Sequence, residues 1–184
     1  MLEFEYVDAN GERHQLSEAW SKGPVWLLWM RHCGCVFFAE AMAELTNAPP
    51  TDVARVCILQ ADAAETAKWC SGNAGCSSCV PDPKRETFAA IGLGHTTFGD
   101  IFKPSESLKQ RRNEATTAGA KQNWLRTFAP GNDVLQLPGA ALVDETGTIR
   151  HIHRGADTSD QLNSLELAKI AAEQLLGRGE DTPL

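Results

Sequence analysis

Apolar runs of strand length predict the strands of this fold. Residues 25–30, VWLLWM, contain no polar side chain, which is typical of a central strand that is covered on both faces. Residues 53–59 predict the next strand along the chain. Residues 2–7 alternate instead and are followed by the turn signal DANG at residues 8–11, so we expect a β-hairpin at the N-terminus.

Helical periodicity follows each of the two central strands. Phe38, Met42 and Leu45 fall at positions i, i+4 and i+7, which predicts a helix that begins near Val36. The sequence NAPP at residues 47–50 ends this helix. Further helices are expected at residues 61–69, 84–91 and 162–176.

The second half of the chain predicts a strand–turn–strand unit, residues 135–153. Residues 105–128 are polar and have only a weak helical pattern. The order strand, helix, strand, helix, hairpin, helix predicts an α/β fold of thioredoxin-like type, with a mixed central sheet and helices on both faces. We expect residues 1–184 to form one domain, because the chain shows no linker and is long enough for one core.

Charge and cysteine usage narrow the possible partners and the compartment. The net charge is −7 and the basic residues are scattered among acids, which argues against nucleic acid and anionic membranes. The chain begins with acidic residues rather than a secretory signal and has no apolar run of about 20 residues, so we expect a cytoplasmic protein. In that compartment the six cysteines are redox, metal-binding or core residues rather than permanent disulfides.

Cys33 and Cys35 lie at the junction between the first central strand and its helix. A cysteine attacks as its thiolate, which is favoured at a helix N-terminus or beside a cation. Cys35 meets the first condition, and Arg31 and His32 are near enough to meet the second. Because an arginine directly after a buried strand cannot enter the core, we expect Arg31 to be available to a thiolate or a substrate anion. Cys33 either captures oxidised Cys35 as a disulfide or is a small apolar residue beside it.

The other four cysteines support weaker hypotheses. Cys57 is expected in the core, because it lies inside a predicted strand. Cys70, Cys76 and Cys79 stand in a stretch of small residues with the spacing C-x5-C-x2-C. They are weak candidates for metal ligands, since a structural zinc site needs four ligands. The alternatives are an auxiliary or resolving thiol and inert or loop-stapling cysteines.

Three stretches resemble the AhpC/TSA, or peroxiredoxin-like, branch of the thioredoxin superfamily: LLWMRHCGC, VPDPKRETFAAIGLG and LQLPGAALVDETGTIRHIHR. The first stretch is similar to that of divergent members with an Arg-x-x-Gly-Cys signature, here Arg31 to Cys35. Typical members carry P-x-x-x-T-x-x-C, and this chain has Leu28 and His32 at the Pro and Thr positions. The C-x-x-C pattern of thioredoxins is absent too, because Phe38 stands three residues after Cys35.

The resemblance implies a thiol oxidoreductase without a cofactor that reduces a peroxide or exchanges disulfides through Cys35. Cys33 or a loop cysteine would resolve the oxidised sulfur, an external dithiol system of thioredoxin or glutathione type would recycle it, and a homodimer is possible. The alternative is a thiol-rich metal-binding or accessory protein that keeps the fold without turnover. Pro138 matches the loop proline of related proteins, which implies a cis Leu137–Pro138 peptide near Cys35.

We expect Cys35 rather than Cys33 to be the nucleophile. It adjoins the predicted helix start, where unpaired amides and the helix dipole act on its sulfur. It follows Gly34, whose missing side chain would leave room for a substrate. It also matches the Gly-Cys of the signature in the family that the chain resembles.

Overall fold

A five-stranded sheet in the order β5-β4-β3-β6-β7 forms the centre of the fold. The computed structural model describes residues 3–72 and 75–176. β3 is parallel to β4 and antiparallel to β6, so the sheet is mixed and β3 is its central strand, as the sequence predicted. The strands of this sheet are β3 (Val25–Trp29), β4 (Ala54–Leu59), β5 (Ser78–Pro81), β6 (Gly139–Val143) and β7 (Ile149–Arg154).

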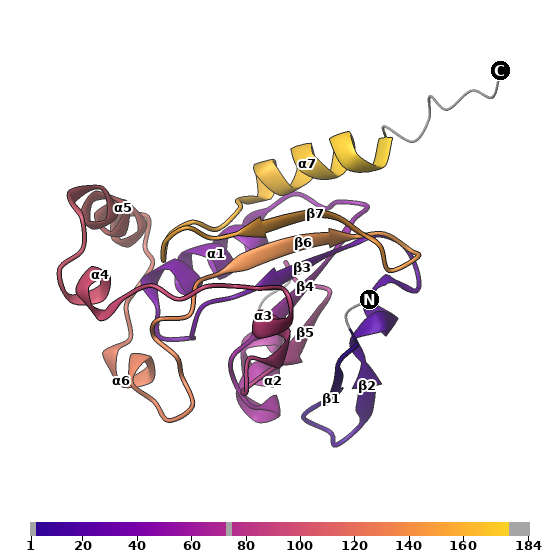
Figure 1. The fold of residues 1–184 in the computed structure, drawn as a ribbon, viewed down its shortest axis with the longest axis horizontal. Coiled ribbons are helices and arrows are strands. Elements are labelled where there is room, and N and C mark those ends of the chain that lie inside the picture. Colours follow the sequence, from indigo (N-terminus) through magenta and orange to yellow (C-terminus); the bar gives the residue numbers. More distant parts are fainter. Residues whose placement is uncertain (1–2, 73–74, 177–184) are drawn as a thin grey trace.

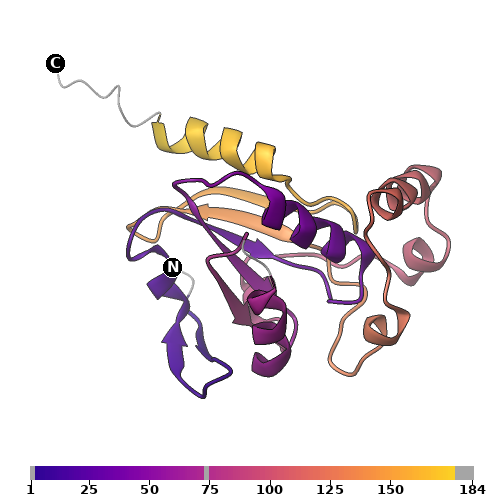
Figure 2. The ribbon, with the colours of Figure 1, turned by 180° about the vertical axis from the view of Figure 1, so that it is seen from behind.

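Every residue of β3 is buried because its side chains alternate between two core layers. Trp26 and Leu28 belong to one layer, and Leu27 and Trp29 to the other. Figures 1 and 2 show α1 and α7 along one side of the sheet, with α3 on the other. None of the helices in the described ranges is long and apolar enough to cross a membrane. The first three α-helices and the last are α1 (Val36–Asn47), α2 (Ala63–Ser71), α3 (Glu86–Ala90) and α7 (Ser164–Leu176).

The predicted N-terminal hairpin is confirmed. β1 (Glu5–Val7) and β2 (Arg13–Gln15) pair antiparallel as a separate two-stranded sheet. Gly11 turns the chain in the left-handed region (φ 84°), which glycine adopts without steric cost. The 3-10 helix η1 (Leu16–Trp20) follows. Its buried residues Leu16 and Trp20 belong to the same core layer as Leu27 and Trp29.

Three helices gather beyond the end of the sheet at which β3 ends (Figures 1 and 2). They are α4 (Phe98–Phe102), α5 (Glu106–Thr117) and α6 (Trp124–Thr127). Of the twelve residues of α5, only Leu108 and Ala115 are buried. Two buried residues do not form an apolar stripe along the helix, which explains why the helical pattern of this region is weak in the sequence.

Candidate active site at the start of helix α1

The cysteine pair lies in the connection between β3 and α1, as the sequence predicted. The amide of Met30 still donates to Ile58 O (2.9 Å), and α1 begins at Val36. Cys35 is the N-cap residue of α1, with an extended backbone (φ −76°, ψ 138°). Its amide donates to His32 O (3.0 Å), which closes the connection into a turn.

Arg31 supplies the direct partner of the Cys35 sulfur. Its Nε donates a hydrogen bond to Cys35 Sγ (3.3 Å), while Nη1 donates to Gln136 O (2.7 Å) and Nη2 to Val134 O (2.8 Å). The expectation that this arginine stays out of the interior is wrong, since its exposed fraction is 2%. A buried guanidinium is tolerated here because three of its N–H groups are satisfied. The side chain is thereby fixed with its charge against the sulfur.

Helix amides contribute less to this sulfur than the sequence suggested. The Cys35 side chain makes no capping hydrogen bond to the first turn of α1. The Val36 amide donates instead to Gln122 Oε1 (3.1 Å). The position of Cys35 at the helix start is as expected, but its hydrogen-bond donor is the Arg31 side chain.

The Cys35 side chain borders a cavity of about 40 Å³. Phe102, Trp124 and Phe128 line the same cavity, and each is more than half exposed to solvent. Cys35 itself is only 6% exposed. Because one water needs roughly 10–15 Å³ of such volume, the cavity admits a polar group of a few heavy atoms.

His32 lines this cavity as a neutral side chain. Burial lowers the pKa of His32 to about 3, and the positive charge of Arg31 acts in the same direction. The expectation that His32 adds a positive charge beside Cys35 is therefore wrong. Its Nδ1 is buried and has no hydrogen-bond partner among the described residues.

Cys33 is a buried thiol that borders a different space. Burial raises the pKa of Cys33 to about 12, and the negative charge of Glu65 acts in the same direction. Its side chain lines a surface groove together with Trp69 and Arg126. At neutral pH Cys33 keeps its proton, and neither Cys33 nor Cys35 is in a disulfide.

Gly34 is required for packing and does not leave room for a substrate, contrary to the expectation from sequence. A Cβ at this position would overlap the backbone of Thr127 and come within 2.7 Å of Asn123 O. Gly34 O accepts hydrogen bonds from Asn123 N (3.0 Å) and Thr127 Oγ1 (3.2 Å). The segment of residues 122–127, which the sequence analysis missed, therefore closes over the cysteine connection.

The predicted cis peptide at Pro138 is wrong, because the Leu137–Pro138 bond is trans. Leu137 N donates to Gly94 O, and Pro138 O accepts from Gly155 N, both at 3.0 Å. These bonds fit an extended chain that runs directly into β6. The loop before the proline still serves the site, since its carbonyl groups accept the two outer hydrogen bonds of Arg31.

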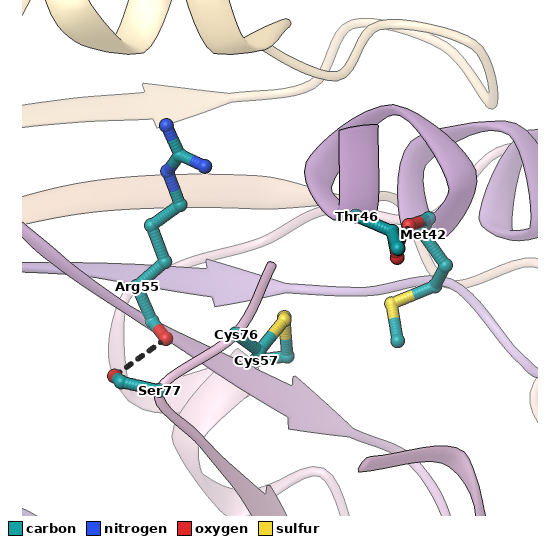
Figure 3. The surroundings of a disulfide bond; sticks show 6 residues. All are labelled: Met42, Thr46, Arg55, Cys57, Cys76 and Ser77. Atoms are coloured by element: carbon teal, nitrogen blue, oxygen red, sulfur yellow. Dashed lines mark hydrogen bonds between the residues drawn. A yellow bond between two sulfur atoms is a disulfide. The ribbon is translucent and has the colours of Figure 1, made fainter. Parts of the chain in front are cut away.

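Cys57 and Cys76 form a disulfide with a Cα–Cα distance of 6.2 Å (Figure 3). Both residues are buried in the core layer that α1 covers. The Ser77 amide and hydroxyl both donate to Arg55 O (2.7 and 2.9 Å), which holds the loop before β5 against β4. Cys57 is a core residue as expected. The expectation of reduced cysteines is wrong for this pair, and the loop-stapling alternative is confirmed for Cys76.

The sulfurs of Cys70, Cys76 and Cys79 do not form a common ligand set. Cys76 is bonded to Cys57, whereas Cys70 and Cys79 are free and half-buried. Within residues 3–72 and 75–176, the group of three side chains close enough to share a metal is on the N-terminal hairpin and contains no cysteine. That group comprises Asp8, Glu12 and His14.

Solved structures share the fold at low sequence identity. AhpC of Enterococcus faecalis has a TM-score of 0.61 and 11% identity, with 100% of this chain and 95% of that chain covered. The peroxidoxin BcpB of Mycobacterium tuberculosis has a TM-score of 0.54 and 16% identity, with 96% and 94% covered. The mitochondrial 2-Cys peroxiredoxin of Plasmodium falciparum has a TM-score of 0.53 and 13% identity, with 100% and 96% covered. These likenesses establish the thioredoxin-like fold.

A family model gives the assignment. No curated protein sequence matches the chain. The model described as AhpC/TSA antioxidant enzyme matches residues 37–157, which is most of the chain, although the match begins just after Cys35. The chain therefore belongs to the AhpC/TSA antioxidant enzyme family.

Proposed function

We propose that this protein is a thiol peroxidase in which Cys35 is the nucleophile. The observation that carries the proposal is the hydrogen bond from Arg31 Nε to Cys35 Sγ (3.3 Å) beside a small cavity. A fixed guanidinium stabilises the negative charge of a thiolate. Membership of an antioxidant enzyme family supports the same chemistry.

In the proposed reaction, the Cys35 thiolate attacks one oxygen of a peroxide. The S–O bond forms as the O–O bond breaks, which leaves Cys35 as a sulfenic acid and releases an alkoxide or hydroxide that takes a proton from water. A guanidinium has five N–H groups, and Arg31 commits three of them to protein acceptors. We propose that one of the remaining N–H groups donates to the peroxide oxygen as it reaches the sulfur.

The closed surroundings of Cys35 favour a peroxide over a protein disulfide as the oxidising substrate. Attack on a protein disulfide requires that the partner's sulfur approach Cys35 along the S–S axis. Cys35 is 6% exposed, and residues 122–127 lie over the connection that carries it. A hydroperoxide group fits the cavity without moving this segment.

We further propose that Cys33 resolves the sulfenic acid and that an external dithiol of thioredoxin or glutathione type recycles the enzyme. Condensation of the Cys33 thiol with the sulfenic acid forms an S–S bond and releases water. Because Cys33 and Cys35 border different spaces, their connection must rearrange for this step.

The test is peroxide consumption by the purified chain with dithiothreitol as reductant, combined with trapping of the sulfenic acid by dimedone. Cys35→Ser should lose both signals, with a fall in turnover of about a thousandfold or more. Cys33→Ser is the matched control and should still be labelled by dimedone, but should over-oxidise at Cys35. If Cys35→Ser consumes peroxide at the wild-type rate, the proposal is wrong.

A further inference from the structure

A second pair of thiols lies apart from Cys35, where α2 packs on β5. Cys70 stands in the last turn of α2 and Cys79 in β5, which is an edge strand of the sheet. Their side chains are hydrogen-bonded to each other, and both residues are half-buried rather than enclosed. Reagents in solution can therefore approach this pair more readily than Cys35.

The pair adjoins the buried disulfide. In the parallel ladder between β4 and β5, Cys57 and Cys79 are register partners. Register partners point to the same face of a sheet, and neighbouring strands lie about 4.8 Å apart. Cys57 is bonded to Cys76, and both of these residues are buried (Figure 3). A half-buried dithiol thus stands beside a buried disulfide.

The two free thiols differ in their protonation. The hydrogen bond from Cys79 lowers the pKa of Cys70 to about 7. The same hydrogen bond, followed by burial, raises the pKa of Cys79 above its usual range. About half of Cys70 is therefore thiolate near pH 7 while Cys79 holds a proton, so Cys70 can accept the Cys79 proton before Cys79 attacks.

We propose that Cys70 and Cys79 form a second redox site, which exchanges with the Cys57–Cys76 disulfide and connects it to thiols in solution. The exchange needs no outside oxidant, because the disulfide is part of the structure. Two electrons move from the half-buried pair to the buried pair.

The exchange proceeds in two balanced steps. In the first, the Cys79 proton passes to Cys70 along their hydrogen bond, and the Cys79 sulfur attacks Cys57. The Cys57–Cys79 bond forms, the Cys57–Cys76 bond breaks, and Cys76 leaves as a thiolate that takes a proton from water. In the second, Cys70 releases its proton to water and attacks Cys79. The Cys70–Cys79 bond forms, and Cys57 leaves as a thiolate and is protonated by water.

The site can be tested without the proposed peroxidase chemistry. In the full chain carrying Cys33→Ser and Cys35→Ser, the four cysteines of the exchange remain and Cys35 cannot contribute. Failure of the exchange in this background leaves the peroxidase proposal untouched, and loss of the peroxidase proposal leaves the exchange untouched.

The first experiment measures how fast reduced glutathione opens the Cys57–Cys76 disulfide in this background, by acid quenching, alkylation and peptide mapping. Adding Cys79→Ser should slow the opening by about tenfold or more, because glutathione can then no longer reduce the buried disulfide through Cys79. An unchanged rate overturns the proposal. Ser71→Ala, an exposed neighbour of the pair in α2, is the control and should keep the rate.

The second experiment maps linkages in protein that holds one disulfide after anaerobic removal of the reductant. Cys70→Ser removes the thiol that completes the exchange, so a Cys57–Cys79 linkage should accumulate beside Cys57–Cys76. Without that change, the background protein should show Cys70–Cys79 beside Cys57–Cys76. If Cys57–Cys76 is the sole linkage in both proteins, the exchange does not occur and the proposal is wrong.

Discussion

The Cys35 region and the Cys70–Cys79 region place a reactive sulfur in opposite surroundings. Cys35 is enclosed, and its partner is a fixed cation, Arg31. Cys70 is half-buried, and its partner is another thiol on an edge strand. The first arrangement suits attack on a small oxidant that enters a small cavity, and the second suits exchange with other sulfur groups. Burial and the choice of hydrogen-bond donor, more than the cysteine itself, distinguish the two chemistries.

The largest expected effect tests the cation at the enclosed site. Arg31→Gln removes the charge and the donor to Cys35, and a hydrogen bond to a charged group contributes about 1.5–3 kcal/mol, so peroxide consumption should fall roughly 10- to 150-fold. The thiol reactivity of Cys70 should stay unchanged. Stopped-flow peroxide kinetics measure the first, and alkylation monitored by mass spectrometry measures the second. The exposed Arg13→Gln is the control. A wild-type peroxide rate in Arg31→Gln would remove the contrast between the two regions.

The next effect tests the thiol partner at the edge site. In the Cys33→Ser/Cys35→Ser background, Cys79→Ala removes the hydrogen bond that lowers the pKa of Cys70 to about 7. The pKa should then rise to 9 or above, and iodoacetamide should alkylate Cys70 about fifty times more slowly at pH 7, because less thiolate is present. The readout is the alkylation rate against pH. A profile that does not shift would show that Cys79 is not the donor.

Low pH should destabilise the folded protein through His32. The folded protein holds this imidazole at a pKa of about 3, whereas an unfolded chain has a histidine pKa near 6.5. Below pH 6.5 the unfolded state therefore binds a proton on His32 that the folded state does not bind. The free energy of unfolding falls as pH falls from 6.5 toward 3. Between pH 7 and pH 5 the wild type should lose about 2 kcal/mol more than His32→Gln. Urea unfolding at the two pH values measures the difference, and equal losses would contradict a neutral, buried His32.

The last prediction concerns residues 122–127, which cover the connection that carries Cys35. Gly34→Ala places a methyl group against the backbone of Thr127, which should cost about 1–3 kcal/mol of stability and displace residues 122–127. Bulky maleimides should then label Cys35 faster, while labelling of Cys70 should not change. Denaturant unfolding and labelling rates provide the readouts. Faster labelling at both cysteines would indicate general loosening instead.

Much of the fold could be predicted because it rests on local patterns. The VWLLWM run identifies β3 as central, since only a strand covered on both faces can be apolar throughout. The positions of Cys33 and Cys35 follow from the change of periodicity at Val36, where α1 begins. These inferences need only neighbouring residues.

The rest of the site depends on contacts between distant segments. The carbonyl groups that fix Arg31 come from Val134 and Gln136, more than a hundred positions away in the sequence. The Cys57–Cys76 pairing depends on how β5 aligns beside β4. The segment over Gly34 lies in a polar region whose few buried residues give no clear period. Sequence patterns contain no signal for such contacts.

The Cys57–Cys76 disulfide also links the oxidation state of the protein to its unfolding. The bonded residues are 19 positions apart, and the loop between them contains α2. Closing a loop of this length in the unfolded chain removes conformational entropy equivalent to about 3 kcal/mol. If the second thiol pair reduces that disulfide, the cross-link moves to Cys70 and Cys79, which are only nine positions apart. The cross-link would then close a shorter loop and restrain the unfolded chain less, so a protease that cuts transiently opened chains should cleave the exchanged form faster.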